Sequence, residues 1–141
     1  MKIITAKNST DLESFYPLIH ELRPHLSLSE FIDIYHHAHK NDQYELTAFF
    51  DDEGQMCAVI GYRILYDFVR GRHLYIDDLV TTSEKRSQGL GQYVLKYAEV
   101  MAKQLNCTGG LRLCAGFENT RGISFYERNG WTQRAIAFVK K

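Results

Sequence analysis

Three consecutive apolar segments in the middle of the chain limit its fold more than any other feature of the sequence. Residues 44–51, 55–69 and 73–82 are rich in β-branched, aromatic and other apolar residues, as β-strands are. Turn sequences separate them at residues 52–54 and 70–71, and turns this short connect neighbouring antiparallel strands. The segments therefore predict antiparallel hairpins in the middle of the fold.

Helical patterns lie on both sides of these strands. Ser27 and Glu30 form an S-x-x-E capping pattern before a helix, and Pro24 ends the helix that precedes it. The other expected elements are a strand at residues 2–7, a helix at 11–22, a long helix at 89–105, a buried strand at 111–115, a short helix at 121–129 and a final strand at 131–139. The order β-α-α-β-β-β-α-β-α-β predicts a mixed α/β fold.

Length and composition predict one domain that spans residues 1–141. The chain is 45% hydrophobic and 24% charged, the proportions of a globular protein. Its longest apolar run, residues 56–62, is far shorter than the roughly 20 residues of a membrane span, and residues 1–10 lack the apolar core of a signal peptide. Three cysteines without a C-x-x-C pair disfavour a disulfide framework and a cysteine zinc site, and favour the cytoplasm.

Charge is balanced overall but not along the chain. Seventeen basic and 17 acidic residues give a net charge of zero, which argues against a nucleic-acid partner. Residues 1–69 hold 11 acidic and 5 basic side chains, and residues 70–141 hold 6 acidic and 12 basic ones. The asymmetry fits either solvated surfaces or a basic half that binds an anion and an acidic half that faces a cation.

A glycine-containing loop precedes the long helix. It consists of Arg86, Ser87, Gln88, Gly89, Leu90 and Gly91. Glycines let a backbone approach a ligand closely, and the free N–H groups at a helix start bind anions. The Rossmann pattern would need a glycine at Val94, and a P-loop would need Gly-Lys-Ser/Thr, which the chain lacks. Taken alone, the loop is therefore either an anion site or a plain turn into a helix.

The loop and a second motif together resemble the GCN5-related N-acetyltransferase (GNAT) family. The family's first signature, Arg/Gln-x-x-Gly-x-Gly/Ala between a strand and a helix, is matched from Arg86 to Gly91. Its second signature, Asn-x-x-small-x-x-Phe-Tyr-x-x-x-Gly-aromatic, is matched by Asn119, Gly122, Phe125, Tyr126, Gly130 and Trp131. Ser87 stands where the family usually has Gly, and Gly122 where Ala is common.

The resemblance implies the GNAT fold, a mostly antiparallel mixed sheet flanked by helices, and acetyl-CoA as the acyl donor without a metal. In this family a bulged strand splays from the next strand and pairs with the pantetheine arm, while the glycine loop cradles the pyrophosphate. The implied cofactor-binding residues are Leu79, Val80, Thr82, Arg86, Ser87, Gln88, Gly89, Leu90, Gly91 and Asn119. Asn119 could also simply cap the helix that follows it.

Acetyl transfer to an amine needs a group that takes a proton and a group that gives one. The second signature makes Tyr126 the candidate that protonates the departing thiolate, although it could instead be a packed aromatic residue. Asp77 aligns with a position at which several family members carry a catalytic Glu, and could act through a water or only hydrogen-bond a strand bulge. On a regular strand Asp77 and Asp78 would point to opposite faces, so that only one could face the site.

Two further candidates for chemistry have simpler explanations. His36 and His39 share a helix face, but without an acidic or cysteine partner in a ligand pattern they predict a polar surface. Cys114 lies on a predicted core strand, where packing is the more common role.

The sequence thus predicts a cytoplasmic N-acetyltransferase that moves an acetyl group from acetyl-CoA to a primary amine of a small molecule or peptide, by direct transfer in a ternary complex. A module that binds acyl-CoA without turnover is the alternative. Neither a nucleic acid nor a membrane is expected as a partner, and the resemblance is compatible with a homodimer.

Overall fold

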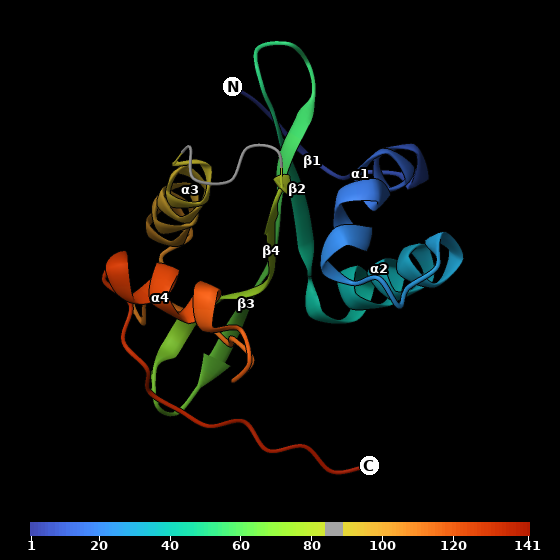
Figure 1. The fold of residues 1–141 in the computed structure, drawn as a ribbon. Coiled ribbons are helices and arrows are strands. Elements are labelled where there is room, and N and C mark those ends of the chain that lie inside the picture. Colours follow the sequence, from blue (N-terminus) through green and yellow to red (C-terminus); the bar gives the residue numbers. More distant parts are fainter. Residues whose placement is uncertain (84–88) are drawn as a thin grey trace.

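A five-stranded sheet separates two pairs of helices in the computed structural model, which describes residues 1–83 and 89–141 (Figure 1). The described elements are β1 (Lys2–Thr5), α1 (Ser9–Leu22), α2 (Leu28–Asp42), β2 (Glu45–Phe50), β3 (Met56–Asp67), β4 (Gly71–Thr81), α3 (Leu90–Gln104), β5 (Leu111–Leu113) and α4 (Thr120–Arg128). The strands follow chain order, β1 to β4 pair antiparallel, and β4 pairs parallel with β5. This arrangement confirms the mixed, mostly antiparallel sheet.

Side-chain caps set the starts of α1 and α2. The side chain of Asn8 accepts a hydrogen bond from the backbone N–H of Asp11 at 2.9 Å. Ser27 and Glu30 form the capping box that the sequence predicts, with both reciprocal hydrogen bonds present. Among the described residues, none of the helices combines the length and the apolar character needed to cross a lipid bilayer.

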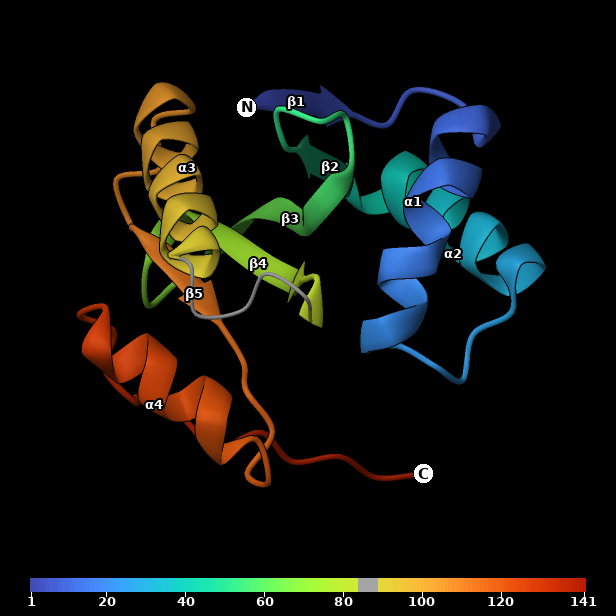
Figure 2. The same cartoon turned by 45° about the horizontal axis from the view of Figure 1, so that its top comes forward.

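Helices lie on both faces of the sheet (Figure 2), and each face has its own apolar core. On one face, α1 and α2 cover residues that include Leu46 and Val59, both fully buried. On the other face, α3 packs over residues that include Leu74 and Ile60, also fully buried. Because both faces are covered, a ligand can reach the middle of the sheet only where strands separate or where helices leave a cleft.

The prediction of a final strand at residues 131–139 is wrong. Residues 131–141 have no regular secondary structure and extend away from α4 as a coil (red in Figure 1). Ile136 and Phe138 are 63% and 90% exposed. Apolar alternation predicts which side chains would share a face, but a strand also needs a partner edge, and β5 spans only three residues.

A bulge in β4 changes the direction in which its later side chains point. Gly61 of β3 pairs with Asp78 and Tyr62 pairs with Ile76, so Asp77 is an extra residue in β4. Before the bulge, Ile76 packs in the core beneath α3, whereas after it Val80 packs in the core beneath α1 and α2. The shift brings Asp77 and Asp78 to the α1–α2 side together, which corrects the expectation of opposite faces.

Tyr44, immediately before β2, crosses β3 to reach this bulge. Its hydroxyl donates a 2.6 Å hydrogen bond to Asp78 Oδ2. A Cβ atom at Gly61 would overlap the Tyr44 hydroxyl, and Gly61 is the cross-strand neighbour of Asp78. Gly61 therefore leaves the space in which the tyrosine ring lies over the strand.

Substituting Gly61→Ala should lower the free energy of unfolding by roughly 1–3 kcal/mol, because the new methyl group displaces the buried Tyr44 ring. Urea unfolding of Gly61→Ala, Tyr44→Phe and the double variant should show a combined loss smaller than the sum of the two. Gly116→Ala is the control, since a Cβ at that glycine meets nothing within 4 Å. A Gly61→Ala protein as stable as the wild type would contradict this packing.

Candidate active site

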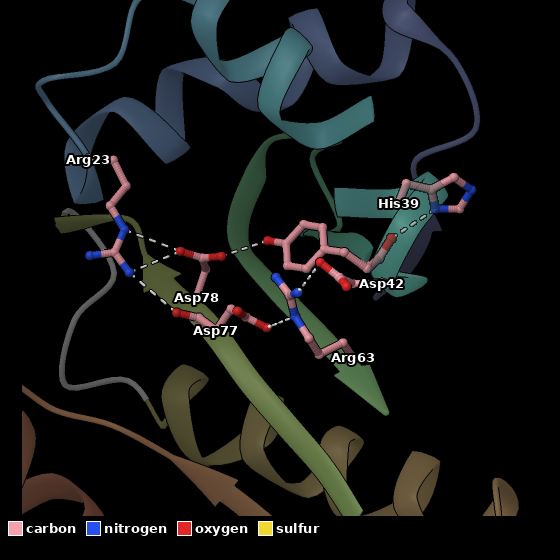
Figure 3. Close-up of polar contacts among 7 residues, drawn as sticks. Arg23, His39, Asp42, Arg63, Asp77 and Asp78 are labelled. Atoms are coloured by element: carbon pink, nitrogen blue, oxygen red, sulfur yellow. Dashed lines mark hydrogen bonds and ion pairs between the residues drawn. The ribbon is translucent and has the colours of Figure 1, made fainter. Parts of the chain in front are cut away.

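Two residues, Arg23 and Tyr44, donate three hydrogen bonds to Asp78 on the α1–α2 side of the sheet (Figure 3). Its Oδ1 accepts from Arg23 Nε at 3.2 Å and from Arg23 Nη2 at 3.0 Å, and its Oδ2 accepts from the Tyr44 hydroxyl. Arg23 Nη2 also donates to the backbone carbonyl of Asp77 at 3.3 Å. Burial and the Asp78 carboxylate raise the pKa of Tyr44 well above its ordinary value. The tyrosine therefore stays protonated and keeps donating to Asp78.

Asp77 forms a separate ion pair with β3. Arg63 Nε donates to Asp77 Oδ1 at 3.0 Å, and Arg63 Nη1 donates to Asp42 Oδ2 at 3.0 Å (Figure 3). Burial raises the pKa of the Asp77 carboxyl, while the Arg63 guanidinium acts in the opposite direction and the neighbouring Asp78 adds to the rise. A carboxylate with a raised pKa accepts a proton more readily near neutral pH.

A cleft of about 370 Å³ opens beside Asp78, between α1, α2 and the β3–β4 pair. Its polar lining comes from Arg23, His25, Tyr44, Arg63 and Asp78. Its apolar lining comes from Ile19, Leu26, Phe31, Ile34, Tyr35 and Ala38. The volume falls in the range of small-molecule sites, and few polar groups among apolar walls are typical of them.

The edge of β4 that faces away from β3 is open from the bulge onward. Pairing with β5 runs only from Leu74 to Ile76, so between Asp77 and Thr81 this edge has no strand partner among the described residues. The separation begins where the bulge lies, as the family resemblance implies. It leaves a strand edge to which an extended ligand can hydrogen-bond.

Backbone directions show which residues of β4 can use that edge. The N–H of Thr82 donates to the carbonyl of Cys57 on β3 at 2.8 Å. Because N–H directions alternate along a strand, the N–H groups of Thr81 and Leu79 point to the open edge. The N–H groups of Val80 and Thr82, which were also expected to bind the cofactor, face β3 instead. Thr81 is a candidate that the sequence did not reveal, since only the register of the β3–β4 pair identifies it.

The start of α3 is suited to an anion. Gly89 is the N-cap residue, with φ +76° and no side-chain cap, and the first turn contains no acidic residue. The first N–H groups of a helix have no partner within it, and a Cβ at Gly89 would meet nothing within 4 Å. The helix start therefore fits a pyrophosphate. Three residues predicted for the same loop, Arg86, Ser87 and Gln88, lie outside the described residues.

Gly91 contacts α4. A Cβ at Gly91 would lie 2.8 Å from Cζ of Phe125, so this glycine is needed for the packing of α4 against α3. Tyr126 follows Phe125 in α4, and its ring packs against the rings of Phe125 and Trp131, at centroid distances of 5.3 and 6.0 Å. Burial raises the pKa of the Tyr126 phenol. The hydroxyl thus carries its proton at neutral pH and is available as a donor.

Asn119 caps α4, which confirms that part of its predicted role. Its side-chain oxygen accepts the Gly122 N–H at 3.0 Å. A Cβ at Gly122 would overlap the Asn119 amide, which explains why glycine stands where alanine is common. Contact of Asn119 with the cofactor stays a prediction.

The metal-ligand and cysteine candidates of the sequence are not part of this site. Within residues 1–83 and 89–141, no group of three or more His, Cys, Asp or Glu side chains could hold a metal ion. Cys114 follows the end of β5 and is exposed, so the expected packing role is wrong because the strand is shorter than the sequence predicts.

Sequence comparisons identify relatives of the whole chain. Residues 9–131 match the acetyltransferase (GNAT) family. An uncharacterized N-acetyltransferase of Bacillus subtilis, YhdJ, is 29% identical over 141 residues, which cover 99% of this chain and 96% of the relative. Thialysine N-ε-acetyltransferase of Bos taurus is 28% identical over 133 residues, which cover 85% of this chain and 78% of the relative.

Solved structures share the fold at lower sequence identity. The aminoglycoside N-acetyltransferase AAC(6')-Iy in complex with CoA matches with a TM-score of 0.83 at 16% identity, over 99% of this chain and 93% of that one. The aminoglycoside 6'-N-acetyltransferase AAC(6')-IG of Acinetobacter haemolyticus matches with a TM-score of 0.78 at 21% identity, over 100% and 99% of the two chains.

Proposed function

The chain belongs to the acetyltransferase (GNAT) family, and we propose that it transfers the acetyl group of acetyl-CoA directly to a primary amine of a small molecule or peptide in a ternary complex. The observation that carries this proposal is the open edge of β4 next to Asp77, with an anion-ready helix start nearby and a cleft on the α1–α2 side. The alternative, binding of acyl-CoA without turnover, is disfavoured because the chain's relatives in this family are named acetyltransferases.

Acetyl-CoA supplies an activated acetyl group as a thioester. The N–H groups of Leu79 and Thr81 hydrogen-bond the pantetheine arm along the open edge of β4. The start of α3, from Gly89 to Gly91, holds the pyrophosphate, where the helix dipole and free N–H groups favour negative charge. Asn119, at the start of α4, contacts the pantetheine with the part of its amide that does not cap the helix.

The acceptor amine reaches the thioester from the α1–α2 side, where both carboxylates lie. Asp77 takes a proton from the ammonium form of the acceptor, directly or through a water, and the neutral amine nitrogen forms a bond to the carbonyl carbon. The bond between that carbon and sulfur then breaks, and the Tyr126 hydroxyl gives its proton to the sulfur. The second proton on the nitrogen then passes to the tyrosine oxygen, which leaves the amide, the thiol and a protonated Asp77. The raised pKa of each group supports these roles, because it keeps Tyr126 protonated and makes Asp77 a better proton acceptor.

Substituting Gly89→Glu should abolish acetyl-CoA binding in calorimetry, because a negative charge then stands at the pyrophosphate site. Gly54→Glu is a matched control: Gly54 also has a positive φ with nothing within 4 Å, but it lies in the β2–β3 turn. Unchanged affinity of the Gly89→Glu protein would contradict the site. Equal loss in both variants would show that backbone strain, rather than charge, is responsible.

Substituting Tyr126→Phe should lower kcat by about 10²-fold or more, the range for loss of a general acid, with little change in acetyl-CoA affinity. Removing only the hydroxyl preserves the ring contacts with Phe125 and Trp131. Thiol release from acetyl-CoA, measured against polyamines, amino acids, aminoglycosides and peptides, identifies an acceptor for this assay. A kcat within about twofold of the wild type would reduce Tyr126 to a packing role.

The pH profile should report the charge on Asp77. A base must be ionised to accept a proton, so kcat/KM for the acceptor should fall as pH decreases through the pKa of Asp77. That pKa lies above the ordinary Asp value of 3.8 because the carboxyl is buried. Asp77→Asn should lower kcat/KM by at least about 10²-fold and remove this acid limb, whereas Asp77→Glu should retain it. An unchanged acid limb in Asp77→Asn would assign the base to another group.

A further inference from the structure

Asp78 is the one carboxylate among the described residues that line the cleft, and the guanidinium of Arg23 forms an ion pair with it. Its Nη2 contacts Asp78 Oδ1 at 3.0 Å and the backbone carbonyl of Asp77 at 3.3 Å. An alkylammonium group carries three N–H donors and can hydrogen-bond the same two oxygens. The position that Arg23 fills is thus one in which a primary amine would lie between the Asp78 carboxylate and the backbone carbonyl of Asp77.

The two partners of Asp78 differ in how firmly they are held. Tyr44 is buried and protonated, so it fixes Asp78 Oδ2. The Arg23 side chain is 43% exposed, and exposed ion pairs contribute only about 0–1 kcal/mol. The backbone of Arg23 is anchored through its N–H to Ile19 at 2.8 Å, so the guanidinium can leave Asp78 by side-chain rotation alone.

The walls of the cleft restrict what else the amine can carry. Apolar side chains from α1, α2 and the connection between them form most of the lining, among them Phe31, Ile34 and Leu26. The described lining offers no carboxylate besides Asp78, and Arg63 is already paired with Asp77 and Asp42. A second ammonium group would therefore lose its hydration against apolar walls without a second carboxylate in the lining, whereas a hydrocarbon body would gain from burial.

We propose that Arg23 is an internal cation that the acceptor displaces from Asp78, and that the acceptor is a monoamine with an apolar body. The inference rests on the proposed acetyltransferase function and names its substrate class and two specificity-determining residues. The ammonium binds Asp78 Oδ1 and the Asp77 carbonyl, the body fills the apolar cleft, and the displaced guanidinium turns to solvent.

Binding of n-butylamine, n-hexylamine, phenethylamine and spermidine to the full chain, measured by NMR titration with and without coenzyme A, tests this proposal. Affinity should rise up to about fourfold per added methylene group between butylamine and hexylamine. Spermidine should bind no more tightly than butylamine. A preference for spermidine, or equal affinity for the two alkylamines, would overturn the assignment of an apolar monoamine.

Variants test the displacement step. Arg23→Ala should bind hexylamine about two- to fivefold more tightly, because the internal competitor is gone, whereas Arg23→Lys should resemble the wild type. Asp78→Asn should weaken binding at least about tenfold. Asp42→Asn is its control, since Asp42 pairs with Arg63 but does not line the cleft.

Weaker hexylamine binding in Arg23→Ala, with urea unfolding unchanged, would overturn the proposal and show that Arg23 itself holds the acceptor. Equal losses in Asp78→Asn and Asp42→Asn would also overturn it. These results do not depend on acetyl-CoA, because the titration without coenzyme A reads the amine site alone. Failure of the proposed function would appear instead as absent acetyl-CoA binding by calorimetry.

Discussion

The extra residue at Asp77 is the constraint on which the rest of the site depends. One additional residue in β4 against β3 shifts the alternation of side chains and brings two adjacent carboxylates to one face of the sheet. Pairing with β5 ends at Ile76, directly before the bulge. The open edge of β4 and the pair of carboxylates therefore begin at the same irregularity in the strand.

Packing between helices joins the other two parts of the site. Gly91 in the first turn of α3 leaves room for Phe125 of α4, and Tyr126 follows Phe125 directly. The anion-ready start of α3 and the tyrosine hydroxyl are thus fixed relative to each other by one close contact. Gly91 therefore serves the packing of α4 against α3, whereas Gly89, with nothing within 4 Å of its Cβ position, leaves the helix start open.

Local features were predictable from the sequence because they depend on neighbours in the chain. The capping box of Ser27 and Glu30, the Asn119 cap and the central strands are of this kind. Hydrophobic periodicity could not predict the bulge at Asp77, because a bulge is set by the pairing of β4 with β3, where Gly61 lies opposite Asp78. The final strand failed for a similar reason, since its partner edge on β5 is set by tertiary structure.

Residue-resolved amide hydrogen exchange along β4 tests the central claim most directly. If the edge freed by the bulge binds the pantetheine arm, acetyl-CoA should slow exchange at Leu79 and Thr81. The amides of Val80 and Thr82 face β3, and their exchange should already be slow and change little. Unchanged exchange at Leu79 and Thr81 in protein saturated with acetyl-CoA would contradict the account.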